Sequence, residues 1–150
     1  MASSEPTTET AARRVLLFRV GGRLYGCEIE AVREIIPFRQ ATRLPGAPPW
    51  VCGLINLRGT IVTVLDLGQR LGGESVPRTE GSVVLVEHAE RAAGIAVDEV
   101  MDVQPLPESR IERAAGEHAH GGLVPGIGHL EDGTVVILLD MPTLVKQVLL

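Results

Sequence analysis

The chain has 150 residues, of which 45% are hydrophobic and only 3% aromatic, and its formal net charge is −5. This composition predicts one domain with an aliphatic core, and it disfavours nucleic-acid binding, which needs a basic groove and aromatic stacking residues. No run of 18 consecutive apolar residues and no signal-peptide pattern is present, so we expect a cytoplasmic protein without membrane insertion.

The first half predicts a series of strands joined by turns. Residues 1–14 are polar and rich in Thr and Glu, which predicts a disordered tail. Residues 30–36 predict a helical turn that runs into a short strand, and the proline-rich residues 41–50 predict a surface loop. Asp66 is placed to cap a short helix. Four stretches have the apolar, β-branched character of strands and form two hairpins: residues 15–20, 24–29, 51–57 and 60–65.

The second half predicts the same order of elements. Residues 105–122 contain prolines, glycines and histidines, which predicts a loop with one short turn. Asp140 is placed to cap a last helix, with Pro142 in its first turn, where proline is tolerated. Four further stretches predict strands: residues 82–86, 91–97, 124–130 and 134–139.

The two halves are also related in sequence. Residues 23–32 align with residues 91–100 at a constant offset of 68, and residues 59–67 align with residues 133–141 at an offset of 74. The second copy therefore carries about six extra residues in its middle loop. Two copies are too few for a solenoid, but they suit two small related barrels of about five strands each. We expect the ordered domain to span residues 15–150, with halves at about 15–75 and 80–150.

The candidate catalytic and metal-binding residues have simpler structural explanations. Cys27 and Cys52 lie in predicted strands and have the character of buried thiols in a reducing compartment. Asp66 and Asp140 occupy equivalent positions of the repeat, and helix capping explains both. The remaining candidates are histidines whose spacing matches no standard zinc motif: His118, His120 and His129. We therefore predict no enzyme activity, no metal and no cofactor, and a metal assay would test the alternative of a histidine-dependent enzyme.

Arg58 is the residue that the repeat does not explain. It lies between Leu57 and Gly59 at a predicted hairpin tip, where the second copy has Glu131-Asp132. Arg58 is therefore either an ordinary exposed turn residue or a recognition residue, whose forked guanidinium can engage carboxylates or carbonyls of a partner.

Several motifs resemble the CheW-like domain family, and most closely its chemotaxis coupling, or adaptor, proteins. The motif G-L-I-N-L-R-G-T-I-V-T-V-L-D-L spans residues 53–67, and Y-G followed by I-E-A-V-R-E-I spans residues 25–35. The family's second-half pattern is similar to residues 94–103, and the late motifs lie at residues 126–127 and 136–140. The resemblance covers about residues 15–150.

The resemblance implies an all-β fold with short helices, made of a duplicated, intertwined pair of five-stranded barrels of the SH3 or OB type. It also implies a non-catalytic scaffold at the inner face of the membrane, which couples chemoreceptors to the histidine kinase CheA. The partners would be the hairpin tip of the receptor's cytoplasmic part and the CheW-like regulatory domain of the kinase. The alternative within the family is an adaptor of another chemosensory-type pathway, such as twitching motility.

The family's functional positions can be carried over by motif. The charged residues among them are Glu34 and Arg58, and Arg58 would also stabilise the domain internally. The receptor-binding residues implied are Val32, Glu34, Gly53, Arg58, Val83, Gly94, Val100 and Val103. The kinase-binding residues expected are Ile35, Ile36, Phe38 and Leu44.

Overall fold

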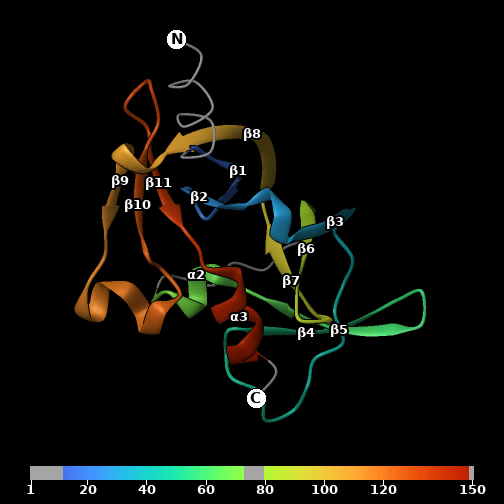
Figure 1. The fold of residues 1–150 in the computed structure, drawn as a ribbon. Coiled ribbons are helices and arrows are strands. Elements are labelled where there is room, and N and C mark those ends of the chain that lie inside the picture. The colour runs from blue at the N-terminus through green and yellow to red at the C-terminus, as the bar shows by residue number, and fades with distance from the viewer. Residues whose placement is uncertain (1–11, 73–79, 149–150) are drawn as a thin grey trace.

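The computed structural model describes residues 12–72 and 80–148, which form two β-sheets with short helices at their ends (Figure 1). The strands are β1 (Ala12–Val20), β2 (Arg23–Glu28), β3 (Val32–Pro37), β4 (Val51–Leu57), β5 (Thr60–Leu65), β6 (Ser82–His88), β7 (Arg91–Val97), β8 (Glu99–Pro107), β9 (Ile111–Arg113), β10 (Gly126–His129) and β11 (Val135–Leu138). The helices are α2 (Leu67–Arg70), α3 (Met141–Val148) and the 3₁₀ turns η1 (Ile29–Ala31), η2 (Glu108–Arg110) and η3 (Gly116–Gly122). None of the helices in the described ranges has the length and apolar character needed to span a bilayer.

The two halves of the chain exchange strands. Sheet A has the order β8-β1-β2-β11-β10-β9, and sheet B has the order β3-β6-β7-β5-β4. The third strand of each half thus pairs with the first strand of the other half: β3 with β6, and β8 with β1. The predicted pair of intertwined barrels is confirmed, and we call the barrels formed by the two sheets barrel A and barrel B.

The strand register confirms the duplication. β5 and β7 pair in parallel with Thr63 opposite Ala93, and β11 and β2 pair in parallel with Ile137 opposite Tyr25. Thr63 and Ile137 differ by 74, and Tyr25 and Ala93 by 68, which are the two offsets found in the sequence. The halves therefore repeat a pairing scheme as well as an order of elements.

The structure differs most from the sequence prediction at the N-terminal strand and over residues 105–122. Strand β1 begins at Ala12, while residues 1–11 of the predicted tail lie outside the described part. The expected loop over residues 105–122 is wrong in part, because it contains the end of β8, the strand β9 and two 3₁₀ turns. Pro105 and Pro107 suggested a loop, but proline is tolerated in β8 because β8 is an outer strand of sheet A. Sheet A thus has six strands rather than five.

Alternating side chains of the central strands fill three separate cores. Val15 and Leu17 of β1 point into barrel A, whereas Leu16 and Phe18 enter a core shared by both barrels. β6 alternates in the same way between barrel B and the shared core. Strands buried on both faces need apolar residues throughout, which explains the uninterrupted runs at residues 15–18 and 83–86.

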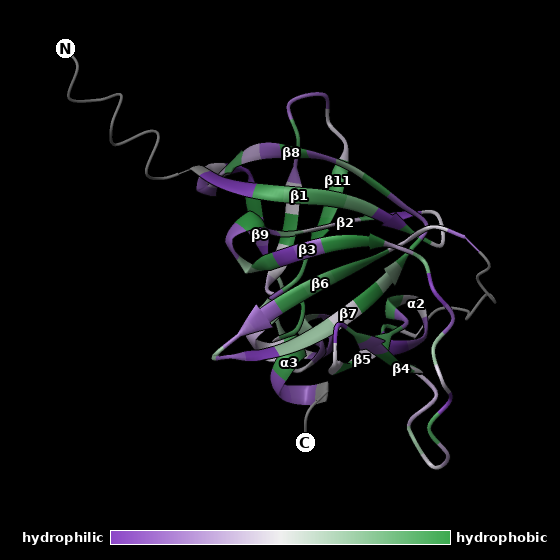
Figure 2. Ribbon diagram, turned by 90° about the vertical axis from the view of Figure 1, so that its right-hand side faces the viewer, coloured by the Kyte–Doolittle hydropathy of each residue, from purple (hydrophilic) through white to green (hydrophobic). Residues whose placement is uncertain are grey.

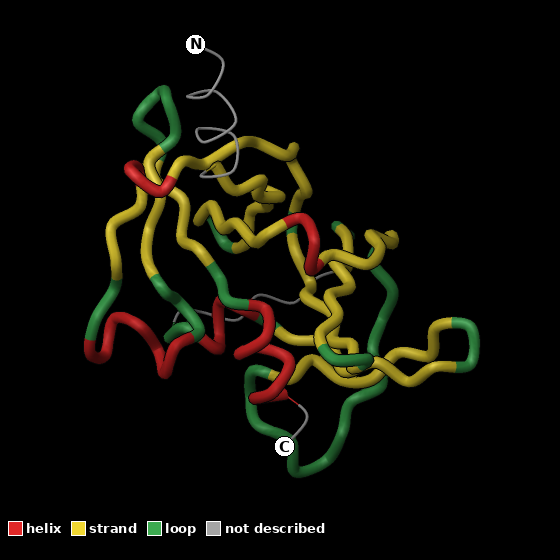
Figure 3. Tube along the Cα trace, viewed as in Figure 1, coloured by secondary structure: helices red, strands yellow, loops and turns green. Residues whose placement is uncertain are grey.

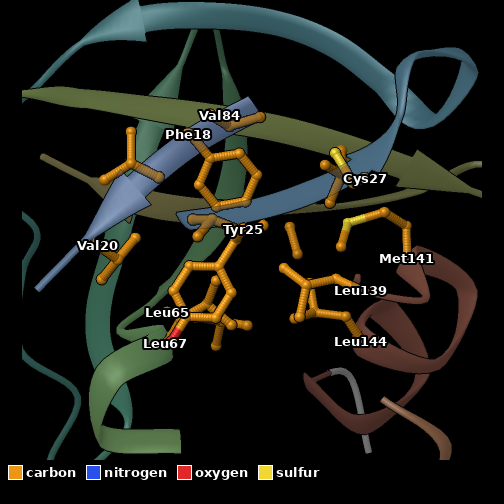
Figure 4. Close-up of a cluster of buried hydrophobic side chains, with 14 of the residues drawn as sticks. Phe18, Val20, Tyr25, Cys27, Leu65, Leu67, Val84, Leu139, Met141 and Leu144 are labelled. Atoms are coloured by element: carbon orange, nitrogen blue, oxygen red, sulfur yellow. The ribbon is translucent and has the colours of Figure 1, made fainter. Parts of the chain in front are cut away.

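The shared core holds the two halves and the last helix together. Phe18 and Tyr25 stack with ring centroids 6.0 Å apart. Figure 4 shows them beside Leu139, Met141 and Leu144, which come from the end of the second half and α3. Neither half can bury these side chains alone, so the exchange of strands and the shared core make the two barrels one unit.

Both predicted helix caps are confirmed. The Asp66 carboxylate accepts a hydrogen bond from the Gln69 amide at 3.3 Å, and the Asp140 carboxylate accepts one from the Thr143 amide at 3.1 Å. The two acids therefore satisfy free amides at helix starts, as their equivalent positions in the repeat suggested.

Candidate interaction surface

Arg58 occupies the tip of the β4–β5 hairpin in a strained conformation. Its φ is 51° and that of Gly59 is 88°, the two positive values that a tight two-residue hairpin turn requires. The side-chain oxygen of Asn56 accepts a hydrogen bond from the Gly59 amide at 2.9 Å and holds the turn closed. Positive φ is unfavourable for arginine, so the turn gains nothing from this residue type. Any contribution specific to arginine at this position must therefore come from its side chain.

The Arg58 side chain joins the two outer strands of sheet B. Its Nη2 donates to Oε1 of Glu34 on β3 at 2.5 Å, while Arg58 itself follows β4. Nearby, Nη1 of Arg39 donates to the Asn56 carbonyl of β4 at 2.8 Å. The two arginines bridge the seam at which barrel B closes.

The contact between Arg58 and Glu34 also stabilises both charges. The hydrogen bond from Arg58 lowers the pKa of the Glu34 carboxyl, and the same bond raises the pKa of Arg58. Glu34 therefore stays ionised well below neutral pH. Because both side chains reach solvent, the pair presents a fixed positive and a fixed negative group to a partner.

A small opening into barrel B lies beside this pair. Its volume is about 180 Å³, and a second ion pair, Arg33 to Glu87 at 3.1 Å, lies close by. Figure 2 shows the hydrophilic residues of β3 giving way to hydrophobic ones towards the end of the strand. The lining combines two arginines with mostly apolar side chains: Arg33, Leu57, Arg58, Thr60, Val62, Leu85 and Ala92.

The residues expected to bind a receptor fall into three groups. Glu34 and Arg58 contact each other at the surface. Val32, Val100 and Val103 are half-buried and pack against the shared core from β3 and β8. The remaining members are buried and lie within sheet B: Gly53, Val83 and Gly94.

The two glycines of the last group keep space for their neighbours. A Cβ atom on Gly94 would lie 2.9 Å from Cγ1 of Val83 inside barrel B. A Cβ atom on Gly53 would lie 2.3 Å from the Thr42 carbonyl oxygen, and its φ of 147° also favours glycine. The backbone clash makes glycine necessary at position 53, and Gly94 leaves room for Val83 inside barrel B.

The residues expected to bind a kinase are divided between surface and core. Ile35 and Leu44 are 42% and 48% exposed, which is unusual for large aliphatic side chains. Phe38 is half-buried, and Ile36 is 7% exposed and lies in the core of barrel B. Of these four residues, Ile35 and Leu44 offer exposed apolar surface.

The other chemical candidates are histidines and cysteines. Nε2 of His129 lies 2.7 Å from Glu112, and His118 and His120 belong to η3. Within residues 12–72 and 80–148, no three His, Cys, Asp or Glu side chains are grouped so as to hold a metal ion. Burial raises the pKa of Cys27 to about 12, which makes its thiol a poor nucleophile.

Sequence reasoning missed two arginines of this surface. Arg33 lies next to Glu34 on β3, and Arg39 follows the end of that strand. Alternation along β3 could have placed Arg33 on the exposed face. The bond from Arg39 to the Asn56 carbonyl depends on the closure of barrel B and has no signal in the sequence.

Comparison with known proteins agrees with this architecture. Chemotaxis protein CheW of Klebsiella aerogenes is 36% identical over 143 residues, covering 93% of this chain and 85% of that protein. Protein PilI of Pseudomonas aeruginosa is 40% identical over 91 residues, covering 60% of this chain and 51% of that protein. The crystal structure of the scaffolding protein TtCheW from Thermoanaerobacter tengcongensis superposes with a TM-score of 0.76 at 30% identity, covering 86% and 89% of the two chains. A family model for the CheW-like domain matches residues 14–149, and the chain belongs to this family.

Proposed function

We propose that this chain is a chemotaxis adaptor that couples chemoreceptors to a CheA-type histidine kinase by non-covalent scaffolding. The observation that carries the proposal is the similarity to chemotaxis protein CheW over nearly the whole chain, together with the two-barrel fold of a scaffolding protein. An adaptor needs exposed recognition groups on a rigid frame, and the pair of Arg58 and Glu34 on barrel B has this character.

The proposed receptor surface centres on Arg58 and Glu34. Its partner would be the hairpin tip of the receptor's cytoplasmic part, at the inner face of the membrane. Half-buried valines of β3 and β8 would supply apolar contact: Val32, Val100 and Val103. The buried members would act from beneath by fixing the backbone of sheet B: Gly53, Val83 and Gly94.

The proposed kinase surface is the exposed apolar part of β3 and the following loop. Ile35 and Leu44 would contact the CheW-like regulatory domain of the kinase, with Phe38 at the margin of the contact. Ile36 would support this surface from the core of barrel B. Both proposed surfaces include β3, so a shift of one partner would be transmitted directly to the other.

The proposed action is thermodynamic. An adaptor that binds receptor and kinase simultaneously changes kinase activity only if it binds the active and inactive arrangements with different free energies. The chain would supply binding energy and geometry and would carry out no reaction of its own.

Kinase autophosphorylation with receptor-bearing membranes tests this proposal. The native chain should increase the rate of kinase phosphorylation, and Arg58→Ala should abolish most of the increase while leaving the unfolding curve nearly unchanged. Arg58→Lys should retain only part of the increase in kinase phosphorylation, because lysine keeps the positive charge but lacks the forked guanidinium group. Lys146→Ala removes an exposed cation from α3 and should behave like the native chain. Full activation by Arg58→Ala would refute the assignment of this surface.

A second candidate is an adaptor of another chemosensory-type pathway, such as twitching motility. The similarity to protein PilI favours it, although this chain covers only 51% of that protein. Co-purification would separate the two candidates by the kinase that the chain retains.

A further inference from the structure

A cavity of about 440 Å³ lies away from the proposed receptor and kinase surfaces. It is formed between the strands β9, β10 and β11, the turn η3 and the end of α2. Figure 3 shows η3 as helical turns below the strands β9 and β10. A volume of this size falls in the range of small-molecule pockets, about 300–1,000 Å³.

The floor of this cavity is apolar. Val124 belongs to the shared core, and Leu71 and Ile137 pack against it. Ile127 of β10 completes the floor. A flat hydrocarbon group bound there would extend the shared core and lose its contact with water.

The polar side chains that line the cavity are mostly of basic residue types. Two guanidinium groups, from Arg23 and Arg113, and two imidazoles, from His118 and His120, line it. The one carboxylate of the lining belongs to Glu112, which His129 contacts at 2.7 Å, while Nη2 of Arg113 lies 3.5 Å from Glu108 outside the lining. In a chain of net charge −5, the two guanidinium groups of the lining favour a negatively charged ligand.

The fold itself does not require this arrangement. η3 lies in the segment that is about six residues longer in the second half than in the first. His120 has φ and ψ of 49° and 49°, a left-handed conformation that is unfavourable for a side chain with a Cβ. Strain of this kind persists where the surrounding structure imposes it, often at binding sites.

We propose that this cavity binds a small organic anion, with its carboxylate at the arginine and histidine rim and an apolar body on the floor. The proposal does not depend on the proposed adaptor function, because it uses a different surface.

Titration of the full chain with three probes, followed by amide NMR and calorimetry, tests the proposal. Benzoate has both the apolar ring and the carboxylate, benzamidine keeps the ring with a positive charge, and inorganic phosphate has only the negative charge. Benzoate should bind with a dissociation constant on the order of 1–10 mM and shift amides near residues 112–127, as expected for a ligand of this size. The other two should bind at least tenfold more weakly. Absence of benzoate binding, shifts elsewhere, or equal binding of either other probe would overturn the proposal.

Two substitutions in the lining test the proposal further and are chosen so that the chain still folds. His120→Gly removes the imidazole and suits the positive φ, so the chain should fold at least as well. Combined with Arg113→Gln, it should weaken benzoate binding at least tenfold. His88→Gln is a control because His88 does not line the cavity, and it should leave the affinity unchanged. Unchanged benzoate affinity in the double variant would contradict the assigned rim.

Discussion

Gly53 gives the sharpest test of the packing of barrel B. In Gly53→Ala, the new Cβ would lie 2.3 Å from the Thr42 carbonyl oxygen, a distance that requires the backbone to move. Thr42 and Leu54 exchange two backbone hydrogen bonds of 2.8 Å at this point, and the shift needed to relieve the clash would break both. Each bond contributes about 1 kcal/mol net, and alanine at a φ of 147° adds strain of about 1 kcal/mol or more. We therefore expect a loss of about 3 kcal/mol in the free energy of unfolding.

Urea denaturation measures this loss, and Gly46→Ala supplies the matched control. Gly46 also has a positive φ of 83°, but a Cβ atom there would meet nothing within 4 Å. Its substitution should cost about 1 kcal/mol, from backbone strain alone. If the two variants lose equal stability, the close approach of Gly53 to Thr42 is not what requires glycine at this position.

Three further predictions concern the single residues Glu90, Asp140 and Cys27. Glu90→Gly should raise the free energy of unfolding by about 0.5–1 kcal/mol in urea denaturation, because Glu90 has a φ of 68° in the β6–β7 turn; a loss of stability would contradict this. Asp140→Ala should cost about 1 kcal/mol, since it removes the acceptor of the Thr143 amide, and an unchanged midpoint would exclude a capping role. Cys27 has a folded-state pKa of about 12 against a reference value of 9.0, so folding favours the protonated thiol. Its contribution to stability should be present below pH 9 and be lost as the pH rises towards 12, by up to about 1.4 kcal/mol per pH unit. Cys27→Ala should lack this slope, and parallel pH profiles for the two proteins would refute it.

The fold was largely predictable because the duplication can be recognised from the sequence alone. The offsets of 68 and 74 appear in the sequence and again in the register of the parallel strand pairs. The capping roles of Asp66 and Asp140 were predictable because a cap is a local interaction. The strand β9 was not, because its three residues are paired with β10 across a loop and have no alternation of their own.

The residue types of the candidate site could be predicted from the sequence, but which of these residues lie at the surface could not. Arg58 stood out because the second half has acids at the equivalent turn, and the structure gives it Glu34 as a partner. Motif matching could not separate Val83 and Gly94, which face the interior of barrel B, from residues at the surface. Which face of a strand is buried depends on how the two barrels close, and this is a property of the whole chain.

Simultaneous binding of receptor and kinase is the most direct test of the proposed adaptor function. A receptor hairpin fragment would be immobilised, and a CheA-type kinase would be added with or without this chain. We expect the chain to raise the recovery of kinase several-fold, and Arg58→Ala to lose most of this gain while still binding kinase in solution. Equal recovery of kinase with and without the chain would contradict the proposed coupling.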